Sequence, residues 1–141
     1  MTTTAAPTQN VGLFLVRYHV GTGLPGAPTL TLALTVNAVD RTINGGARLM
    51  QAISPPLDLR MNVHGTYALI PMPPAPGIIA NLTGYPALHW PPGGGIGPVL
   101  LPDLDLHMQL DTDFHGGVAS YRYLAANGQW IDVNGVPVRK E

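Results

Sequence analysis

The 141-residue chain contains no cysteine, and its single lysine and single glutamate are the last two residues. The absence of cysteine excludes disulfide bonds, thiolate metal sites and cysteine nucleophiles. Charged residues make up 11% of the sequence, whereas globular proteins usually contain about 25%. Since solvated helices are normally built from Lys, Glu, Gln and Arg, this shortage argues against long surface helices. A surface with so few charges also repels other copies weakly, and we therefore expect a homo-oligomer.

Several classes of protein are excluded or disfavoured by patterns that the sequence lacks. Six scattered arginines and one lysine form no basic stripe, which argues against nucleic-acid binding. No apolar run approaches the roughly 18 residues of a membrane span. Residues 1–10 are small and polar and carry no secretory signal pattern, so we expect a flexible segment and, by default, a cytoplasmic protein. A signal-independent export route stays open.

Motifs of catalysis and cofactor binding are also missing. The sequence contains no P-loop, no dinucleotide-binding glycine pattern and no Gly-x-Ser-x-Gly motif. We predict no catalytic residue and no cofactor, and a binding role is favoured over an enzymatic one.

The abundant residues favour strands joined by turns. Glycine (17 residues) and proline (15 residues) accompany many Thr, Val and Leu. We predict one all-β domain over residues 11–141, an antiparallel sandwich or barrel of about eight to ten strands. Asn127-Gly128 and Asn134-Gly135 predict two tight hairpin turns near the end of the chain. The strands are expected at residues 13–20, 29–38, 42–53, 57–69, 78–82, 103–115, 118–126, 130–133 and 136–139.

The stretch from Asp103 to His115 alternates between polar and apolar residues without interruption. Successive side chains of a strand point to opposite faces, so the pattern predicts a strand with an apolar inner face and a charged outer face. On the outer face, Asp105, His107 and Asp111 are candidate binding residues. Carboxylates and imidazoles suit divalent metals, but residues two apart on a strand lie about 6.5–7 Å apart, too far for one ion to contact more than two.

Three uses of this charged face remain open. A metal site would need ligands from neighbouring strands, for which His19, Asp58 and His64 are candidates. A polar ligand such as a sugar is a second use. The favoured alternative is a solvated surface, on which the mixed-charge face formed by Arg60 and Asp58 pairs with the aspartates across two strands.

Residues 71–102 contain nine prolines and six glycines and predict a long irregular loop with at most the one short strand at 78–82. Tyr85, His89 and Trp90 lie in this stiff segment and are candidate binding residues. An exposed aromatic ring on a rigid loop stacks on a sugar ring or on a partner protein. The alternative is that Trp90 plugs one end of the β-structure.

Four segments in the first half of the chain resemble a small bacterial family that is known only as a domain of unknown function. The segments are GLFLVRY at residues 12–18, LPGAP at 24–28, SPPLD at 54–58 and HGTY at 64–67. The resemblance implies a bacterial origin and a β-rich domain. It implies no activity, because these are strand and turn residues.

The sequence therefore predicts a non-enzymatic binding or assembly module that self-associates and recognises a carbohydrate or another polar ligand. One alternative is a small β-barrel that encloses an apolar small molecule, as a carrier or as an isomerase, since eight strands leave room for one ligand. A second alternative is a purely structural subunit of a larger assembly. The choice among them depends on the three-dimensional arrangement of the strands.

Overall fold

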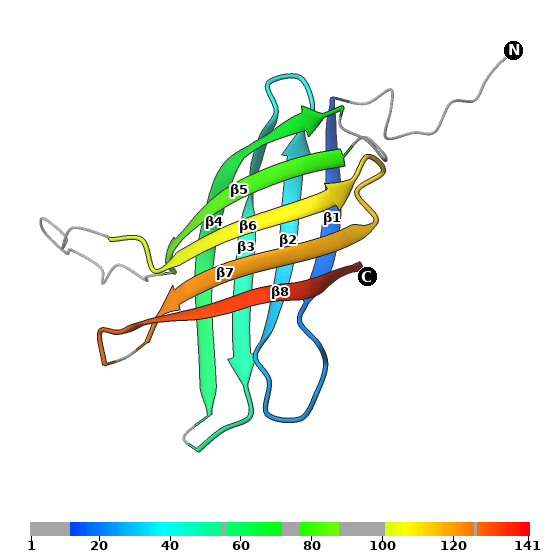
Figure 1. The fold of residues 1–141 in the computed structure, drawn as a ribbon. Helices are drawn as coiled ribbons and strands as arrows, with labels where there is room; N and C mark the ends of the chain where they lie inside the picture. The colour runs from blue at the N-terminus through cyan, green and yellow to red at the C-terminus, as the bar shows by residue number, and fades with distance from the viewer. Residues whose placement is uncertain (1–11, 55, 72–76, 88–100, 126) are drawn as a thin grey trace, which may run out of the picture.

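Eight antiparallel strands close into a barrel in the computed structural model, which describes residues 12–54, 56–71, 77–87, 101–125 and 127–141 (Figure 1). Each strand pairs with its neighbours in the sequence, and β1 pairs with β8 to close the sheet. The all-β antiparallel prediction is confirmed, and the fold is the barrel. The strands are β1 (Leu13–Val20), β2 (Thr29–Asn37), β3 (Thr42–Gln51), β4 (Leu57–Ile70), β5 (Gly77–Pro86), β6 (Leu104–Asp111), β7 (Gly116–Leu124) and β8 (Trp130–Lys140).

Apolar residues at alternate positions of the strands face the barrel interior and form one buried cluster. In β6, the side chains of Leu104, Leu106, Met108 and Leu110 are buried, and the polar residues between them face outward, as the alternation predicts. Leu69 lies near the rim at the end of β4, where its side chain is 49% exposed. In the described part of the chain, no helix is long and apolar enough to cross a membrane.

The paired glycines of β3 mark a close approach between strands. The pairing of β3 with β2 and β4 runs through Gly45 and Gly46 without a shift in register. A Cβ atom on Gly45 would overlap the carbonyl oxygen of Ala33 on β2, and one on Gly65 of β4 would overlap that of Asn81 on β5. Glycine at such inward positions lets a sheet bend sharply, which a small closed barrel requires.

Strand β5 lies inside the stretch that was predicted as a loop with one short strand. It pairs along its whole length with β4, from Gly77 opposite Ile70 to Pro86 opposite Met61. Its buried residues alternate up to Gly84, where a Cβ would contact the side chain of Leu104. The pairing on both sides therefore outweighs the glycine and proline content of this stretch. The predicted flexible segment 1–10 and the candidates His89 and Trp90 lie outside the described residues.

One of the two predicted hairpins at the end of the chain is a bulge. Asn127-Gly128 does connect β7 to β8, with a positive φ of 86° at Gly128. Asn134-Gly135 instead lies within β8, which is one continuous strand. The register shifts there, so Ser120 of β7 faces both residues, and the Gly135 amide donates a hydrogen bond to its Oγ (3.0 Å). An Asn-Gly pair supplies a left-handed glycine to either structure, and the partner strand decides between them.

The strand predicted to run to His115 ends at Asp111. The Asp111 carbonyl accepts a hydrogen bond from the Phe114 amide (3.1 Å), and its Oδ1 accepts one from the His115 amide (2.8 Å). This turn holds Phe114 at a positive φ of 60° and buries its ring at the end of the barrel where β1 begins and β4 ends. The ring meets Phe14 and Tyr67 edge-on, with centroids 5.2 and 5.4 Å apart. Phe114 therefore closes this end of the core.

The seam between β1 and β8 is much shorter than the other pairings. Its register runs only from Tyr18 opposite Lys140 to Val20 opposite Val138. One backbone hydrogen bond extends it at each end, from Gly21 to Pro137 and from Glu141 to Arg17. Within the described ranges, residues 13–16 of β1 therefore pair only with β2, and residues 130–136 of β8 pair only with β7. In the part of the chain that the structure describes, these two segments are free sheet edges.

Candidate functional site

Polar side chains from four neighbouring strands gather on the outer face of β5 to β8. In register across the sheet lie Thr83, Asp105, Arg122 and Asp132, and beside them Asn81, His107 and Ser120. We call these seven residues the polar wall. Neighbours directly opposite each other on paired strands have Cβ atoms about 4.5–5.5 Å apart, so these groups converge across the sheet. Convergence of this kind could not be obtained along β6 alone.

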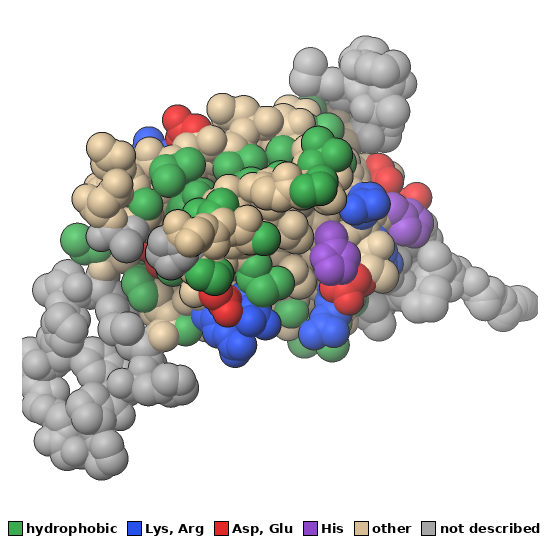
Figure 2. Space-filling view, turned by 90° about the horizontal axis from the view of Figure 1, so that it is seen from below, with side chains coloured by type: hydrophobic (Ala, Val, Ile, Leu, Met, Phe, Trp, Pro, Cys, Tyr) green, Lys and Arg blue, Asp and Glu red, His purple; other side chains and the backbone are tan. Residues whose placement is uncertain are grey.

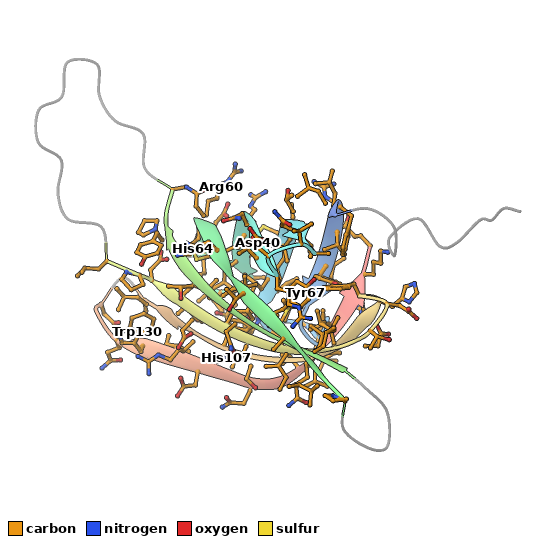
Figure 3. The ribbon with its side chains drawn as sticks, turned by 90° about the horizontal axis from the view of Figure 1, so that it is seen from above. Asp40, Arg60, His64, Tyr67, His107 and Trp130 are labelled. Carbon is orange, nitrogen blue, oxygen red and sulfur yellow. The ribbon has the colours of Figure 1, made fainter. Side chains whose placement is uncertain are left out.

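His107 is held between two side chains of the polar wall. Its Nδ1 lies 2.5 Å from Oδ1 of Asn81, and its Nε2 lies 3.4 Å from Oδ1 of Asp105. Its side chain is 57% exposed, so the oriented imidazole still faces solvent (Figure 3). A shallow groove of about 300 Å³ runs beside it, lined among others by Ile79, Val118 and Ser120. The site offers an imidazole, an amide and a hydroxyl next to a small apolar surface.

Flat side chains flank the polar wall on both sides. The Tyr85 ring stacks on His64, with centroids 5.5 Å apart and an interplanar angle of 5°. The Arg122 guanidinium lies 4.6 Å from the centroid of the Trp130 ring, a cation–π arrangement. His64 and Trp130 both lie on the outside of the barrel in Figure 3. The wall thus combines hydrogen-bonding groups with ring faces, which is the combination that sugar recognition uses.

The structure separates the residues that the sequence analysis grouped together. Asp105 and His107 lie side by side in the polar wall, and Tyr85 stacks on His64 at its border. Asp111 lies at the far end of β6, where its side chain holds the turn before Phe114. Within the described ranges, no three His, Asp or Glu residues come together as metal ligands.

The mixed-charge face of Arg60 and Asp58 does not pair with the β6 aspartates in the described part of the chain. Asp58 pairs with Arg48, and Arg60 lies opposite Arg48 in the register. Asp105 of β6 faces Arg122. His19, a candidate metal ligand, lies 3.3 Å from a carboxylate oxygen of Glu141.

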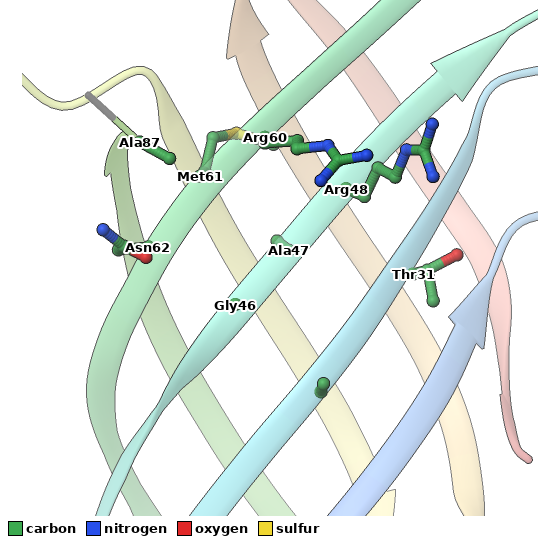
Figure 4. Close-up of a pocket in the computed structure, with 9 residues that line it drawn as sticks. Thr31, Gly46, Ala47, Arg48, Arg60, Met61, Asn62 and Ala87 are labelled. Atoms are coloured by element: carbon green, nitrogen blue, oxygen red, sulfur yellow. The ribbon is translucent and has the colours of Figure 1, made fainter. Parts of the chain in front are cut away.

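A second groove, of about 350 Å³, lies on the outer face of β2 to β4 (Figure 4). Arg48 and Arg60 stand directly opposite each other in the register of β3 and β4. Nε and Nη2 of Arg48 donate hydrogen bonds to the two carboxylate oxygens of Asp58, at 3.0 and 2.8 Å. This pair raises the pKa of Arg48 and lowers the pKa of Asp58, mainly through the hydrogen bonds. We call this second groove the arginine groove. It is lined by Thr31, Ala33, Gly46, Ala47, Arg48, Arg60, Met61, Asn62 and Ala87.

The sequence analysis missed Arg48 and the arginine groove. A signal was present, because Arg48 and Arg60 are equally far from Ser54 in the predicted turn between their strands. A symmetric hairpin around that residue places them opposite each other, and the structure has this register.

Asp103 is the most perturbed carboxyl group of the described chain. It precedes β6, and its backbone bonds to Gly84 of β5 (2.8 Å) and to Leu124 of β7 (2.9 Å). Burial raises the pKa of its side chain to about 6, partly offset by a hydrogen bond to its backbone. Its Oδ1 and the Tyr121 hydroxyl are buried without a hydrogen-bond partner among the described residues. Asp103 therefore exchanges its proton in the slightly acidic range.

A family model described as a domain of unknown function (DUF1842) matches residues 11–130 of the chain. No curated protein matches the sequence. The comparisons therefore assign no ligand, and the geometry of the outer surface carries the functional argument.

Proposed function

The chain belongs to the DUF1842 family, whose description assigns no function, and we propose that it is a non-enzymatic binding module that recognises a small polar ligand, such as a sugar. The ligand site is the polar wall. The observation that carries the proposal is the convergence of Asn81, Asp105, His107 and Arg122 from three adjacent strands, next to the Trp130 ring. Hydroxyl groups of a sugar both donate and accept hydrogen bonds, and these side chains offer both kinds of partner.

An outside site is also favoured by how the barrel is filled. The inward side chains form one continuous buried cluster, and an enclosed apolar ligand, the other use of an eight-stranded barrel, would have to share that space. The grooves beside His107 and between Arg48 and Asn62 open outward. Both observations support a ligand site on the outer faces of the strands.

The test is a titration of the full chain with neutral mono- and disaccharides, followed by backbone amide NMR shifts. Saturable shifts are expected at Asn81, His107 and Ser120. Asp105→Asn should weaken binding about tenfold or more, because it removes a charged hydrogen-bond acceptor. Asp113→Asn is the matched control: it removes the same charge from an exposed carboxylate in the β6–β7 turn, outside the wall. Equal affinities of the two variants, or no saturable shift at the wall, would contradict the proposal.

Self-association is a second candidate function, and the free sheet edges favour it. Residues 13–16 of β1 have an unpaired edge in the described part of the chain, and Leu13 and Leu15 there are 59% and 78% exposed. An exposed apolar edge strand is a template for pairing with a second chain. Figure 2 adds that apolar side chains occupy the middle of the lower face of the barrel, while charged ones lie toward its edges.

Light scattering on a sizing column tests this candidate at micromolar concentrations. We expect an oligomer that Leu15→Lys dissociates, because a lysine on an edge strand opposes pairing. Val39→Lys adds the same charge at an exposed position in the β2–β3 turn and should leave the oligomer intact. A monomer at all concentrations would exclude self-association, and growth without limit would indicate a structural subunit instead.

A further inference from the structure

We propose that the arginine groove binds a small monocarboxylate, with the Arg60 guanidinium as the principal group that holds the anion. The site lies on β2 to β4, apart from the polar wall on β5 to β8. The proposal for the arginine groove therefore does not depend on the proposed sugar site, and each can be tested separately.

The placement of charge in the groove points to an anion. The chain has only seven Lys and Arg residues, and two of them face each other across β3 and β4. Like charges directly opposite on paired strands destabilise a sheet. Asp58 offsets one of them through its two hydrogen bonds with Arg48. The pairing leaves one positive charge, on Arg60, and a bound monoanion would balance it.

Within the described ranges, no salt bridge joins Arg60 to an acidic side chain. All eight Asp and Glu residues of the sequence lie in these ranges. The ion pair beside the groove joins Arg48 to Asp58, and Arg60 acts on Asp58 only as a nearby charge that helps to lower its pKa. The Arg60 guanidinium is a planar fork of donors that matches a carboxylate through two parallel hydrogen bonds. The Thr31 hydroxyl and the Asn62 amide stand on opposite sides of the groove (Figure 4) and add further donors.

The floor of the groove suits a short aliphatic body. It is formed by the small residues Ala33, Gly46 and Ala47, with Met61 and Ala87 beside them. At Gly46, the nearest atom that an added Cβ would meet is the Met61 carbonyl oxygen, 3.9 Å away. The volume of about 350 Å³ lies near the lower limit of small-molecule sites, about 300–1,000 Å³. A carboxylate on a short alkyl chain therefore fits both the charge and the space.

The experiment titrates the full chain with butyrate at constant ionic strength and follows the arginine Nε–Hε NMR signals. We expect a saturable shift of the Arg60 signal with butyrate, a smaller one with inorganic phosphate, and none with neutral butyramide. Arg60→Gln should weaken butyrate binding about tenfold or more. Arg139→Gln, which removes an equal charge from the exposed outer face of β8, should leave it unchanged.

Asp58→Asn tests the charge argument itself. It frees the Arg48 guanidinium and leaves two positive charges in the groove, so phosphate binding should strengthen about tenfold relative to butyrate. Arg60→Lys is a further variant that keeps the charge and removes the planar fork, and it should also lose affinity for butyrate. Absence of a saturable shift at Arg60, equal effects of Arg60→Gln and Arg139→Gln, or tighter binding of phosphate by the unmodified chain would each overturn the proposal.

Discussion

Replacing Phe114 with alanine should leave a cavity at the end of the barrel core that its ring closes. The Phe114 side chain is only 8% exposed and touches Phe14 and Tyr67 edge-on. Truncation of a buried phenylalanine costs about 3–5 kcal/mol of unfolding free energy, and edge-to-face pairs account for about 0.5–1.5 kcal/mol each. Unfolding entropy is about 2.1 cal/mol/K per residue, which gives about 0.3 kcal/mol/K for 141 residues. The melting temperature should therefore fall by about 10–17 °C.

A second variant separates packing from backbone strain at the same position. Phe114 has a φ of 60°, a conformation that costs a residue with a Cβ about 1–2 kcal/mol and costs glycine almost nothing. Phe114→Gly should therefore be about 1 kcal/mol more stable than Phe114→Ala, although it removes more of the side chain.

Urea unfolding followed by circular dichroism and tryptophan fluorescence measures both differences, and an unchanged denaturant slope confirms that the variants unfold in the same way. Val39→Ala, at a side chain that is 84% exposed, is the control and should change stability little. The reasoning fails if Phe114→Ala costs no more than Val39→Ala. The strain argument fails separately if Phe114→Gly is the less stable of the two Phe114 variants.

Three further predictions concern single positions. Gly45→Ala should cost about 2 kcal/mol or more by overpacking against the Ala33 carbonyl, whereas Gly46→Ala, whose Cβ would meet its nearest neighbour at an ordinary contact distance of 3.9 Å, should be nearly neutral in the same urea assay. Ser120→Ala removes the acceptor of the Gly135 amide and should cost about 1 kcal/mol, with faster hydrogen exchange at Gly135; an unchanged exchange rate would show that the bulge holds without it. Because the pKa of Asp103 is raised from 3.8 to about 6, the folded state holds the extra proton, so stability should fall as the pH rises from about 4 to about 6. Asp103→Asn should remove this pH-dependent loss of stability, which is about 1 kcal/mol after allowance for solvent screening. The prediction is refuted if the melting temperature of the variant depends on pH in the same way as that of the unmodified chain.

Sequence patterns predicted the inner face of the barrel because alternation reports burial directly. Leu30, Leu32 and Leu34 in β2 and the leucines of β6 lie inside as their spacing indicates. The choice between sandwich and barrel could not be made in this way, because alternation is the same in both. That choice depends on the seam between β1 and β8, whose residues carry no signal of their own.

Local signals failed where a partner strand decides the structure. Asn134-Gly135 is as good a turn sequence as Asn127-Gly128, but the first lies opposite Ser120 and becomes a bulge. The turn at Asp111 could not be predicted, because polar and apolar residues continue to alternate from Asp111 to His115. Phe114 in this turn occupies a backbone conformation typical of glycine. The candidate sites depend on lateral neighbours in the same way. Asp105 and His107 could be predicted, and the turn at Ser54 signals Arg60 beside Arg48, whereas Arg122 beside Asp105 requires the register.

The short seam has a consequence for the order in which the molecule folds. All other strand pairings join strands that follow each other in the chain, so their contacts form with little loss of chain entropy. The cost of joining distant parts of the chain falls on the contacts of Tyr18, His19 and Val20 with β8 alone. We therefore expect an open eight-stranded sheet to form first and to close in a late step. Hydrogen exchange should then show the amides at the seam opening at a lower free energy than the rest of the core, by a motion that leaves every hairpin intact.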